Sequence, residues 1–121
     1  AFWWLRMLSP SERELLGSVA NQFDQMDKEQ TRTAVKAILR ELTEIAPGRS
    51  VELRIPPFAA TQIVDGHTHR RGTPAAVVEL DAATLCQLAI GHSTWAVLVG
   101  QGLILASGER SDLSRLFPLS S

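Results

Sequence analysis

The chain has 121 residues, of which 45% are hydrophobic, and its formal net charge is -1 at pH 7. This size accommodates one compact domain with a hydrophobic core and leaves no room for two. The balanced charge argues against a nucleic-acid partner and against an anionic membrane surface. No apolar run approaches the roughly 18 residues of a membrane span, which argues against stable membrane insertion. A single cysteine, Cys86, excludes a disulfide framework and a zinc cluster of thiolates. We therefore expect a cytoplasmic protein without a cofactor.

The first 26 residues are predicted to form an aromatic segment and an extra helix, ahead of a main domain at 27–121. The opening "AFWWL" is too short for the core of a signal peptide, and a small domain rarely leaves such residues in water. We expect Phe2, Trp3 and Trp4 to dock on the domain's own surface or on a second copy. A homodimer through these three residues is therefore one partner interaction to test.

Two helices are predicted in the first 48 residues. Ser9-Pro10-Ser11-Glu12 has the form of a capping box, and Asp27-Lys28-Glu29-Gln30 repeats the pattern. Residues of one face follow each start at helical spacing, and Ala46-Pro47-Gly48 ends the second helix. These residues are Leu15, Leu16, Val19, Ala20, Phe23 and Met26 in the first helix, and Thr31, Ala34, Val35, Ile38, Leu39, Leu42 and Ile45 in the second.

The pattern then changes to a period of two, which is typical of half-buried strands. Residues 51–55 alternate between apolar and charged, and Pro56-Pro57 ends this strand because proline has no N–H to donate. Further strands are predicted at 58–64 and 75–80. They are separated by the polar stretch "DGHTHRRGTP", which begins with a turn.

Helices and strands alternate in the rest of the chain. Asp81 is placed to cap a short helix that Gly91 ends. Residues 95–99 are apolar, and so short a run does not distinguish a helix from a strand. A strand is predicted at 103–107, and Ser111-Asp112 begins a last helical turn. Taken in order, these elements predict an α+β fold, with a mostly antiparallel sheet of about four to five strands covered on one face by helices.

The stretch "VVELDAATLCQLAIGHSTWAVLVGQGLILASGERSDLSRLFPL" resembles the core of the sterol carrier protein fold, the fold of non-specific lipid-transfer proteins. The family has an acidic residue that opens a helix of the form "D..tL..L.tG", a short apolar helix, a strand of the form "G.l...G" and a C-terminal helix. The matching residues here are Asp81, Leu85, Leu88, Gly91, Gly102 and Gly108. This resemblance implies that residues 95–99 are helical.

The segments "RIPPFAA" and "RGTP" make the resemblance narrower. They are similar to short actinobacterial proteins known as bacterial sterol carrier orthologues, over roughly Asp27 to Leu119. A related fold occurs as the C-terminal domain of mycothiol-dependent maleylpyruvate isomerases. The resemblance therefore implies either a non-catalytic carrier of a hydrophobic small molecule, such as a lipid, acyl chain or sterol-like compound, or an accessory domain that binds proteins.

In the family, the sheet and the C-terminal helices bound a hydrophobic tunnel, which is the kind of pocket that apolar ligands occupy. The same side chains are also expected core residues, and sequence does not reveal whether they leave a void. The candidate pocket residues are Leu85, Leu88, Trp95, Val99, Leu103, Leu105, Leu113, Leu116 and Phe117.

Arginine binds carboxylates and phosphates through a planar fork, so the arginine-rich stretch suggests a site for an anion or a ligand head group. The candidate residues are Arg54, His69, Arg70 and Arg71, with Arg110 as a possible neighbour. The alternative, which we favour, is a solvated hairpin whose charges prevent the sheet edge from pairing with another chain.

A metal or catalytic site has little support in the sequence. His67 and His69 would point to one face of an extended segment, but zinc needs a third protein ligand. Asp65 and Glu79 are available without forming a recognisable ligand pattern. Because Cys86 lies among leucines of a helix and no nucleophile motif is present, we expect a protein that is not an enzyme.

Overall fold

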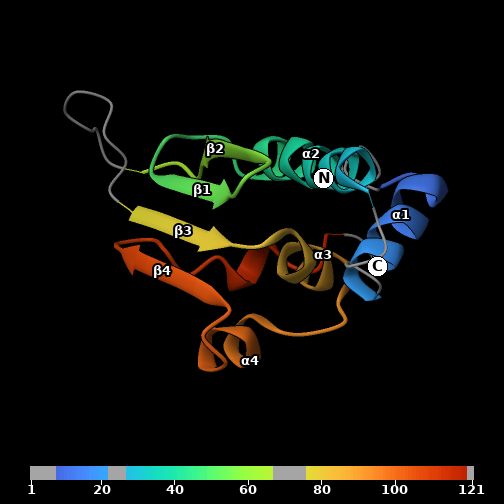
Figure 1. The fold of residues 1–121 in the computed structure, drawn as a ribbon. Coiled ribbons are helices and arrows are strands. Elements are labelled where there is room, and N and C mark those ends of the chain that lie inside the picture. Colours follow the sequence, from blue (N-terminus) through green and yellow to red (C-terminus); the bar gives the residue numbers. More distant parts are fainter. Residues whose placement is uncertain (1–7, 22–26, 67–75, 120–121) are drawn as a thin grey trace.

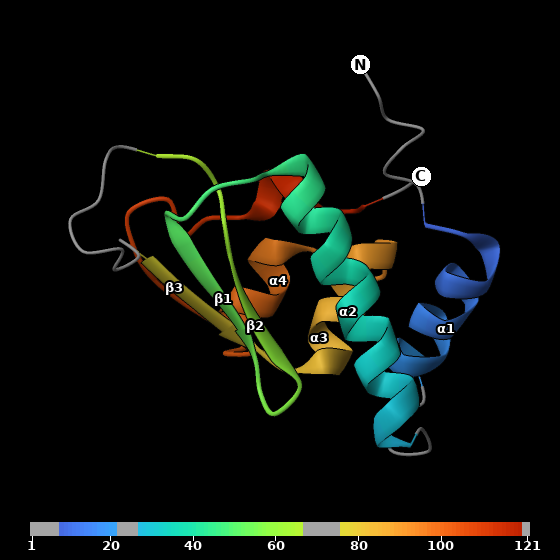
Figure 2. The same ribbon diagram turned by 90° about the horizontal axis from the view of Figure 1, so that it is seen from above.

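The computed structural model describes residues 8–21, 27–66 and 76–119. The described part of the chain forms an open sheet with helices packed on one of its faces (Figures 1 and 2). The elements are α1 (Pro10–Asn21), α2 (Lys28–Ile45), β1 (Val51–Ile55), β2 (Ala59–Ile63), β3 (Ala76–Leu80), α3 (Ala82–Ile90), α4 (Trp95–Gly100), β4 (Ile104–Gly108) and a 3₁₀ turn, η3 (Ser114–Leu116).

The strand order is β2-β1-β3-β4. β1 pairs antiparallel with β2 and parallel with β3, and β3 pairs antiparallel with β4. The predicted α+β class is confirmed, with four strands in a sheet that is mixed because β3 lies on the far side of β1 from β2. Neither β2 nor β4 has a second strand beside it in the described sheet, so the sheet is not closed.

Burial alternates along the two central strands as the period of two predicts. Val51, Leu53 and Ile55 of β1 are buried, as are Val78 and Leu80 of β3. They pack in one hydrophobic core with the apolar face of α2 and with α3, and these contacts account for most of the stabilisation of so short a sheet. The opposite face of β1 and β3 carries Glu, Arg and Val and is not covered by a helix (Figure 2).

The starts that the sequence indicates for the first two helices are confirmed. The Ser9 hydroxyl accepts the Glu12 N–H at 3.1 Å, and the Glu12 carboxylate accepts the Ser9 N–H at 3.0 Å. Asp27 forms the same reciprocal pair with Gln30, at 2.7 and 3.4 Å. Each such cap typically contributes about 1 kcal/mol of stability. The predicted continuation of the first helix to Phe23 and Met26 lies outside the described residues.

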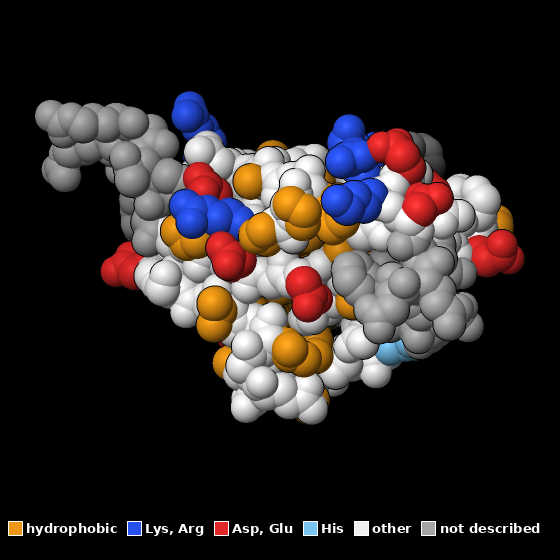
Figure 3. All heavy atoms as spheres, viewed as in Figure 1, with side chains coloured by type: hydrophobic (Ala, Val, Ile, Leu, Met, Phe, Trp, Pro, Cys, Tyr) orange, Lys and Arg blue, Asp and Glu red, His pale blue; other side chains and the backbone are white. Residues whose placement is uncertain are grey.

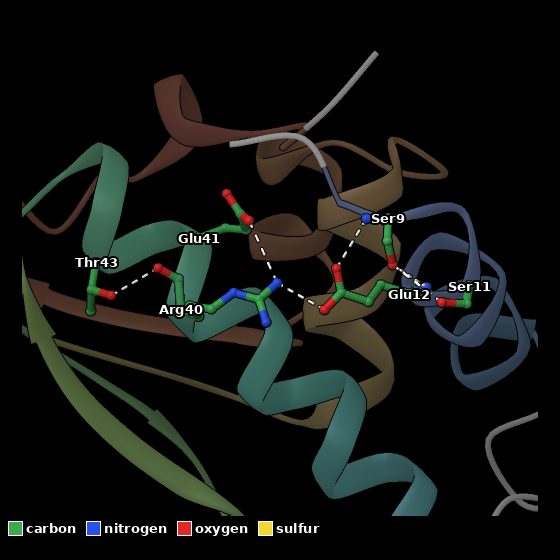
Figure 4. A network of polar contacts seen from close by, with 6 residues as sticks. All are labelled: Ser9, Ser11, Glu12, Arg40, Glu41 and Thr43. Atoms are coloured by element: carbon green, nitrogen blue, oxygen red, sulfur yellow. Dashed lines mark hydrogen bonds and ion pairs between the residues drawn. The ribbon is translucent and has the colours of Figure 1, made fainter. Parts of the chain in front are cut away.

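An ion-pair network joins the first two helices (Figure 4). Arg40 of α2 donates to the Glu12 carboxylate of α1 at 2.8 Å, and its Nη2 lies 3.6 Å from Oε1 of Glu41. The Ser9 N–H and the Arg40 guanidinium lower the pKa of Glu12 below its usual value. α1 also packs on α3, so the extra N-terminal helix is part of the same packed body. The predicted boundary between residues 26 and 27 stays a prediction.

Several boundaries differ from the predicted ones by a few residues. Residues 56–58 form a turn, so β2 begins at Ala59, and β4 lies one residue later than the predicted strand. Residues 95–100 are helical, as the family resemblance implies. The last helical turn begins at Ser114 rather than at Ser111, because the Asp112 side chain accepts the Ser114 N–H at 2.9 Å.

Candidate functional site

A pocket of about 390 Å³ lies where α3 ends and α4 begins, with the segment after η3 as its third wall. This volume falls in the lower part of the range for small-molecule sites. Most of its lining is apolar, and three hydroxyl side chains border it. The lining residues are Leu88, Gly91, Ser93, Thr94, Trp95, Ala96, Ser114, Phe117 and Pro118.

Local features of the chain shape this pocket. Gly91 ends α3 in the left-handed conformation, with φ 81°, which glycine adopts readily. The Thr94 hydroxyl then accepts the Val97 N–H at 3.3 Å and so caps α4. The Leu119 N–H donates to the Ala89 carbonyl at 2.9 Å, which holds the C-terminal segment against α3. Phe117 and Pro118 are thereby fixed as a wall opposite α4.

The nine predicted pocket residues are divided between this pocket, the core and two further hollows. Leu88, Trp95 and Phe117 line the pocket. The core contains Leu85, Leu113 and Leu116. Val99, Leu103 and Leu105 lie near β4, where their side chains are 41%, 43% and 62% exposed.

Six lining residues of the pocket were not predicted, and all are small or polar. Three of them lie between the helix-ending Gly91 and the cap at Thr94, which is a local signal, whereas no signal of this kind marks Ala96, Ser114 and Pro118. These six are Gly91, Ser93, Thr94, Ala96, Ser114 and Pro118.

A second hollow, of about 410 Å³, follows β4 at the edge of the sheet. A third, of about 310 Å³, adjoins it and shares Glu79 and Leu105 with it. The second is lined by Val77, Glu79, Val99, Ile104, Leu105, Ala106 and Ser107, and the third by Pro56, Glu79, Leu80, Asp81, Gly102, Leu103 and Leu105.

The candidate anion residues lie mostly outside the described part of the chain, which includes neither His69 nor Arg70 nor Arg71. Arg54 is exposed on β1 and forms an ion pair with Glu52. It therefore already has an anionic partner on its own strand.

Arg110 lies beside the turn that leads into the arginine-rich stretch. Its Nη1 donates to the Asp65 carbonyl at 3.5 Å, and its φ of 67° is left-handed. Gly66 packs so closely that an added Cβ would lie 2.0 Å from the Ser50 hydroxyl. Of the arginines in the described residues, Arg110 is thus the one placed at the entrance to this stretch.

The described residues contain no group of three or more His, Cys, Asp or Glu side chains that could hold a metal ion. His67 and His69 lie outside them, so the metal hypothesis is not tested at those positions. Cys86 is fully buried in the core, and burial together with the nearby Asp81 raises the pKa of its thiol to about 12. At neutral pH it is therefore a protonated, apolar side chain rather than a nucleophile.

No curated protein matches this chain. Within the described residues, no helix is both long enough and apolar enough to cross a membrane. A family model described as "Bacterial SCP ortholog", where SCP stands for sterol carrier protein, matches residues 27–119. This match extends from the cap of α2 through the C-terminal wall of the pocket and includes all four strands. Because the match covers most of the sequence, the chain belongs to the family of bacterial sterol carrier protein orthologues.

Proposed function

We propose that the chain is a non-catalytic binding or carrier protein for a hydrophobic small molecule, held in the pocket between α3, α4 and the C-terminal segment. Membership of the sterol carrier family suggests such a role. The observation that carries the proposal is the combination of Leu88, Trp95 and Phe117 on the wall of one pocket. Leu88 is buried there, whereas Trp95 and Phe117 are half-buried and offer apolar surface to a ligand.

The driving force would be removal of apolar surface from water. Each methylene group that a ligand buries contributes about 0.8 kcal/mol, before the cost of ordering the chain is subtracted. A volume of about 390 Å³ suits a short acyl chain or one end of a larger molecule. Ser93, Thr94 and Ser114 border the pocket and supply hydroxyl groups for a polar head.

The position of Ala96 offers a direct test. Ala96 lines the pocket and is exposed, so Ala96→Phe fills the pocket without disturbing the core. Val97→Phe is the matched control, because Val97 is the next residue of α4, is 49% exposed and lines none of the three hollows.

The assay is titration of each protein with a fluorescent fatty acid, with thermal unfolding as the check on folding. We expect Ala96→Phe to weaken binding at least about tenfold and Val97→Phe to leave it within about twofold. Failure of the unaltered protein to bind the probe would contradict an acyl-chain carrier. Equal loss in both variants would place the binding site elsewhere.

We also propose a site for an anion or a ligand head group at the arginine-rich stretch, with Arg54, His69, Arg70 and Arg71 as the candidates. Arg110 lies at the entrance to this stretch and would add a further guanidinium there, whereas Arg54 already pairs with Glu52. The cytoplasmic location stays a prediction. So does the homodimer through Phe2, Trp3 and Trp4, because these three residues lie outside the described part of the chain.

A second candidate function is an accessory domain that binds proteins without a lipid, as in the C-terminal domain of mycothiol-dependent maleylpyruvate isomerases. The observation in its favour is the exposure of four large apolar side chains, at Val97, Val99, Leu103 and Leu105. Native mass spectrometry of protein taken directly from cells separates the two functions. A retained lipid supports the carrier, and an apo mass together with failure to bind the probe supports the accessory domain.

A further inference from the structure

β4 is an open edge of the sheet. It is the last strand in the order β2-β1-β3-β4, so within the described residues one of its two sides has no neighbouring strand. Its sequence, Ile-Leu-Ala-Ser-Gly, contains no charge and no proline. Monomeric proteins usually protect a sheet edge with lysine, proline, a bulge or a covering helix. β4 has neither lysine nor proline, and α4 contacts this strand but leaves residues 105–108 exposed (Figure 1).

The opposite edge of the sheet is protected. α2 packs against β2, the strand at that edge. The Arg49 side chain donates to the Gln62 side chain of β2 at 3.0 Å, and the Arg32 guanidinium lies 6.0 Å from the centre of the Phe58 ring. α4 contacts β4 in turn, but residues 105–108 of β4 are all exposed, whereas Ala60 is the only fully exposed residue of β2. β4 is therefore the more accessible of the two edges.

Side chains on both faces of β4 are exposed. Leu105, which shares a face with Glu79 and Arg54, is 62% exposed. Ala106 shares the opposite, helix-facing side with Val78 and is nevertheless exposed. In Figure 3, hydrophobic and other uncharged atoms lie over α4 and most of β4, and hydrophobic side chains are also visible over β1 and β2 among the charged ones. Apolar surface thus borders the free edge on both sides.

The shape of this edge is complementary to itself. In an antiparallel pair centred on Ala106, Leu105 of each copy would stand opposite Ser107 of the other, since 105 and 107 are equally far from the centre. Ser107 and Val77 line the hollow of about 410 Å³, and Val77 is the residue beside Ser107 on β3. The small Ser107 leaves room that the large Leu105 of a second copy fills. One patch then contributes both the projecting side chain and the hollow, as a two-fold interface requires.

We propose that two copies of this chain associate by antiparallel pairing of β4 with β4, which joins their sheets into one of eight strands. The two-fold axis of this pairing is perpendicular to the sheet, so the helices of both copies lie on the same face of the joined sheet. Uncharged strands meet at the axis, and no like charges oppose each other across it. This interface is independent of the ligand pocket and does not use the N-terminal aromatic residues.

Leu105→Glu tests the proposal, because it places two carboxylates near the axis beside the two copies of Glu79. Leu105 is largely exposed, so the substitution does not disturb the core. Ala60→Glu is the matched control, since Ala60 is exposed on the opposite edge strand and stands in register with Arg54. Sedimentation velocity over a range of concentrations measures the dimer, and circular dichroism confirms that each variant folds.

We expect a dimer for the unaltered chain and for Ala60→Glu, and a dissociation constant raised at least about tenfold for Leu105→Glu. Mixing Leu105→Glu with Leu105→Lys should restore a heterodimer, because the two side chains lie diagonally across the axis. A chain that stays monomeric up to about 1 mM overturns the proposal. So does a dimer that Leu105→Glu leaves intact while substitution of Phe2, Trp3 and Trp4 by alanine abolishes it.

Discussion

Glu41 has a buried carboxylate oxygen without a hydrogen-bond partner in the described structure, and replacing this residue should stabilise the protein. Its side chain is 5% exposed, and Oε2 is buried without a hydrogen-bond partner. Such an atom costs about 1–3 kcal/mol. The attraction of Oε1 to Arg40 at 3.6 Å returns no more than about 1 kcal/mol, because Arg40 is half exposed and already bonds Glu12 (Figure 4).

We therefore expect Glu41→Leu to raise the free energy of unfolding by about 1–2 kcal/mol at pH 7, because leucine fills a similar volume and favours helix. Glu41→Gln removes the charge but leaves a polar group, so its gain should be smaller. Glu44→Leu, at an exposed position of the same helix, is the control and should change stability by less than about 0.5 kcal/mol. Urea unfolding followed by circular dichroism gives all three values.

The pH dependence of stability shows whether the buried carboxylate of Glu41 is the cause of this gain. Burial raises the pKa of Glu41 above its value in the unfolded chain, so the folded protein holds this proton more tightly. The resulting stabilisation is complete below the unfolded pKa and is lost as the pH rises through the raised folded pKa. The advantage of Glu41→Leu should thus grow between about pH 4 and pH 7. Glu12, whose lowered pKa has the opposite effect, is present in both proteins. A difference in unfolding free energy between the two proteins that does not change with pH would contradict the role of the buried Glu41 charge. So would a Glu41→Leu variant that is less stable than the unaltered protein at pH 7.

Three further predictions concern single residues. The Cys86 thiol, with its pKa raised to about 12, should react with a disulfide reagent at pH 8 at least about 100-fold more slowly in buffer than in urea, and comparable rates would contradict its burial. Gly48→Ala should destabilise by more than about 2 kcal/mol, because φ is 148° and the added Cβ would lie 2.2 Å from the Val64 carbonyl, whereas Gly100→Ala has open space and should be neutral or stabilising. Asp81→Ala removes the 2.8 Å cap on the Thr84 N–H and should cost about 1 kcal/mol in thermal or urea unfolding, with no loss expected for Asp81→Asn.

Local signals in the sequence predicted the helix starts well, because a capping hydrogen bond joins residues only three positions apart. Ser9, Asp27 and Asp81 all cap the helices that their positions indicate. The run at 95–99 was ambiguous because five residues are too few for a period, and the family resemblance resolved it. The parallel pairing of β1 with β3 joins segments separated by a hairpin and a long connection, so no local pattern indicates it.

The candidate site was harder to predict, as β4 illustrates. Ile104 and Leu105 are both apolar and adjacent, so a period of two does not decide which of them faces the helices. The prediction placed Leu103 and Leu105 among the pocket residues. The structure exposes both, buries Ile104 between them, and places both on hollows beside β4 rather than on the pocket between α3 and α4. A leucine in the core and a leucine on a pocket wall also look alike in sequence, because only packing distinguishes Leu85 from Leu88.

α4 links the two proposals, because its short length leaves only one of its residues, Leu98, buried. Trp95 and Ala96 line the ligand pocket, and Val99 lines the hollow at the β4 edge. The two surfaces therefore share a helix but no lining residue, and substitutions can separate them. If α4 is rigid, Ala96→Phe should weaken ligand binding and leave the dimer intact, and Leu105→Glu should weaken the dimer and leave ligand binding intact. If ligand binding instead shifts α4, the dissociation constant of the dimer should change when ligand is added, and by reciprocity dimerisation must then change ligand affinity by the same factor.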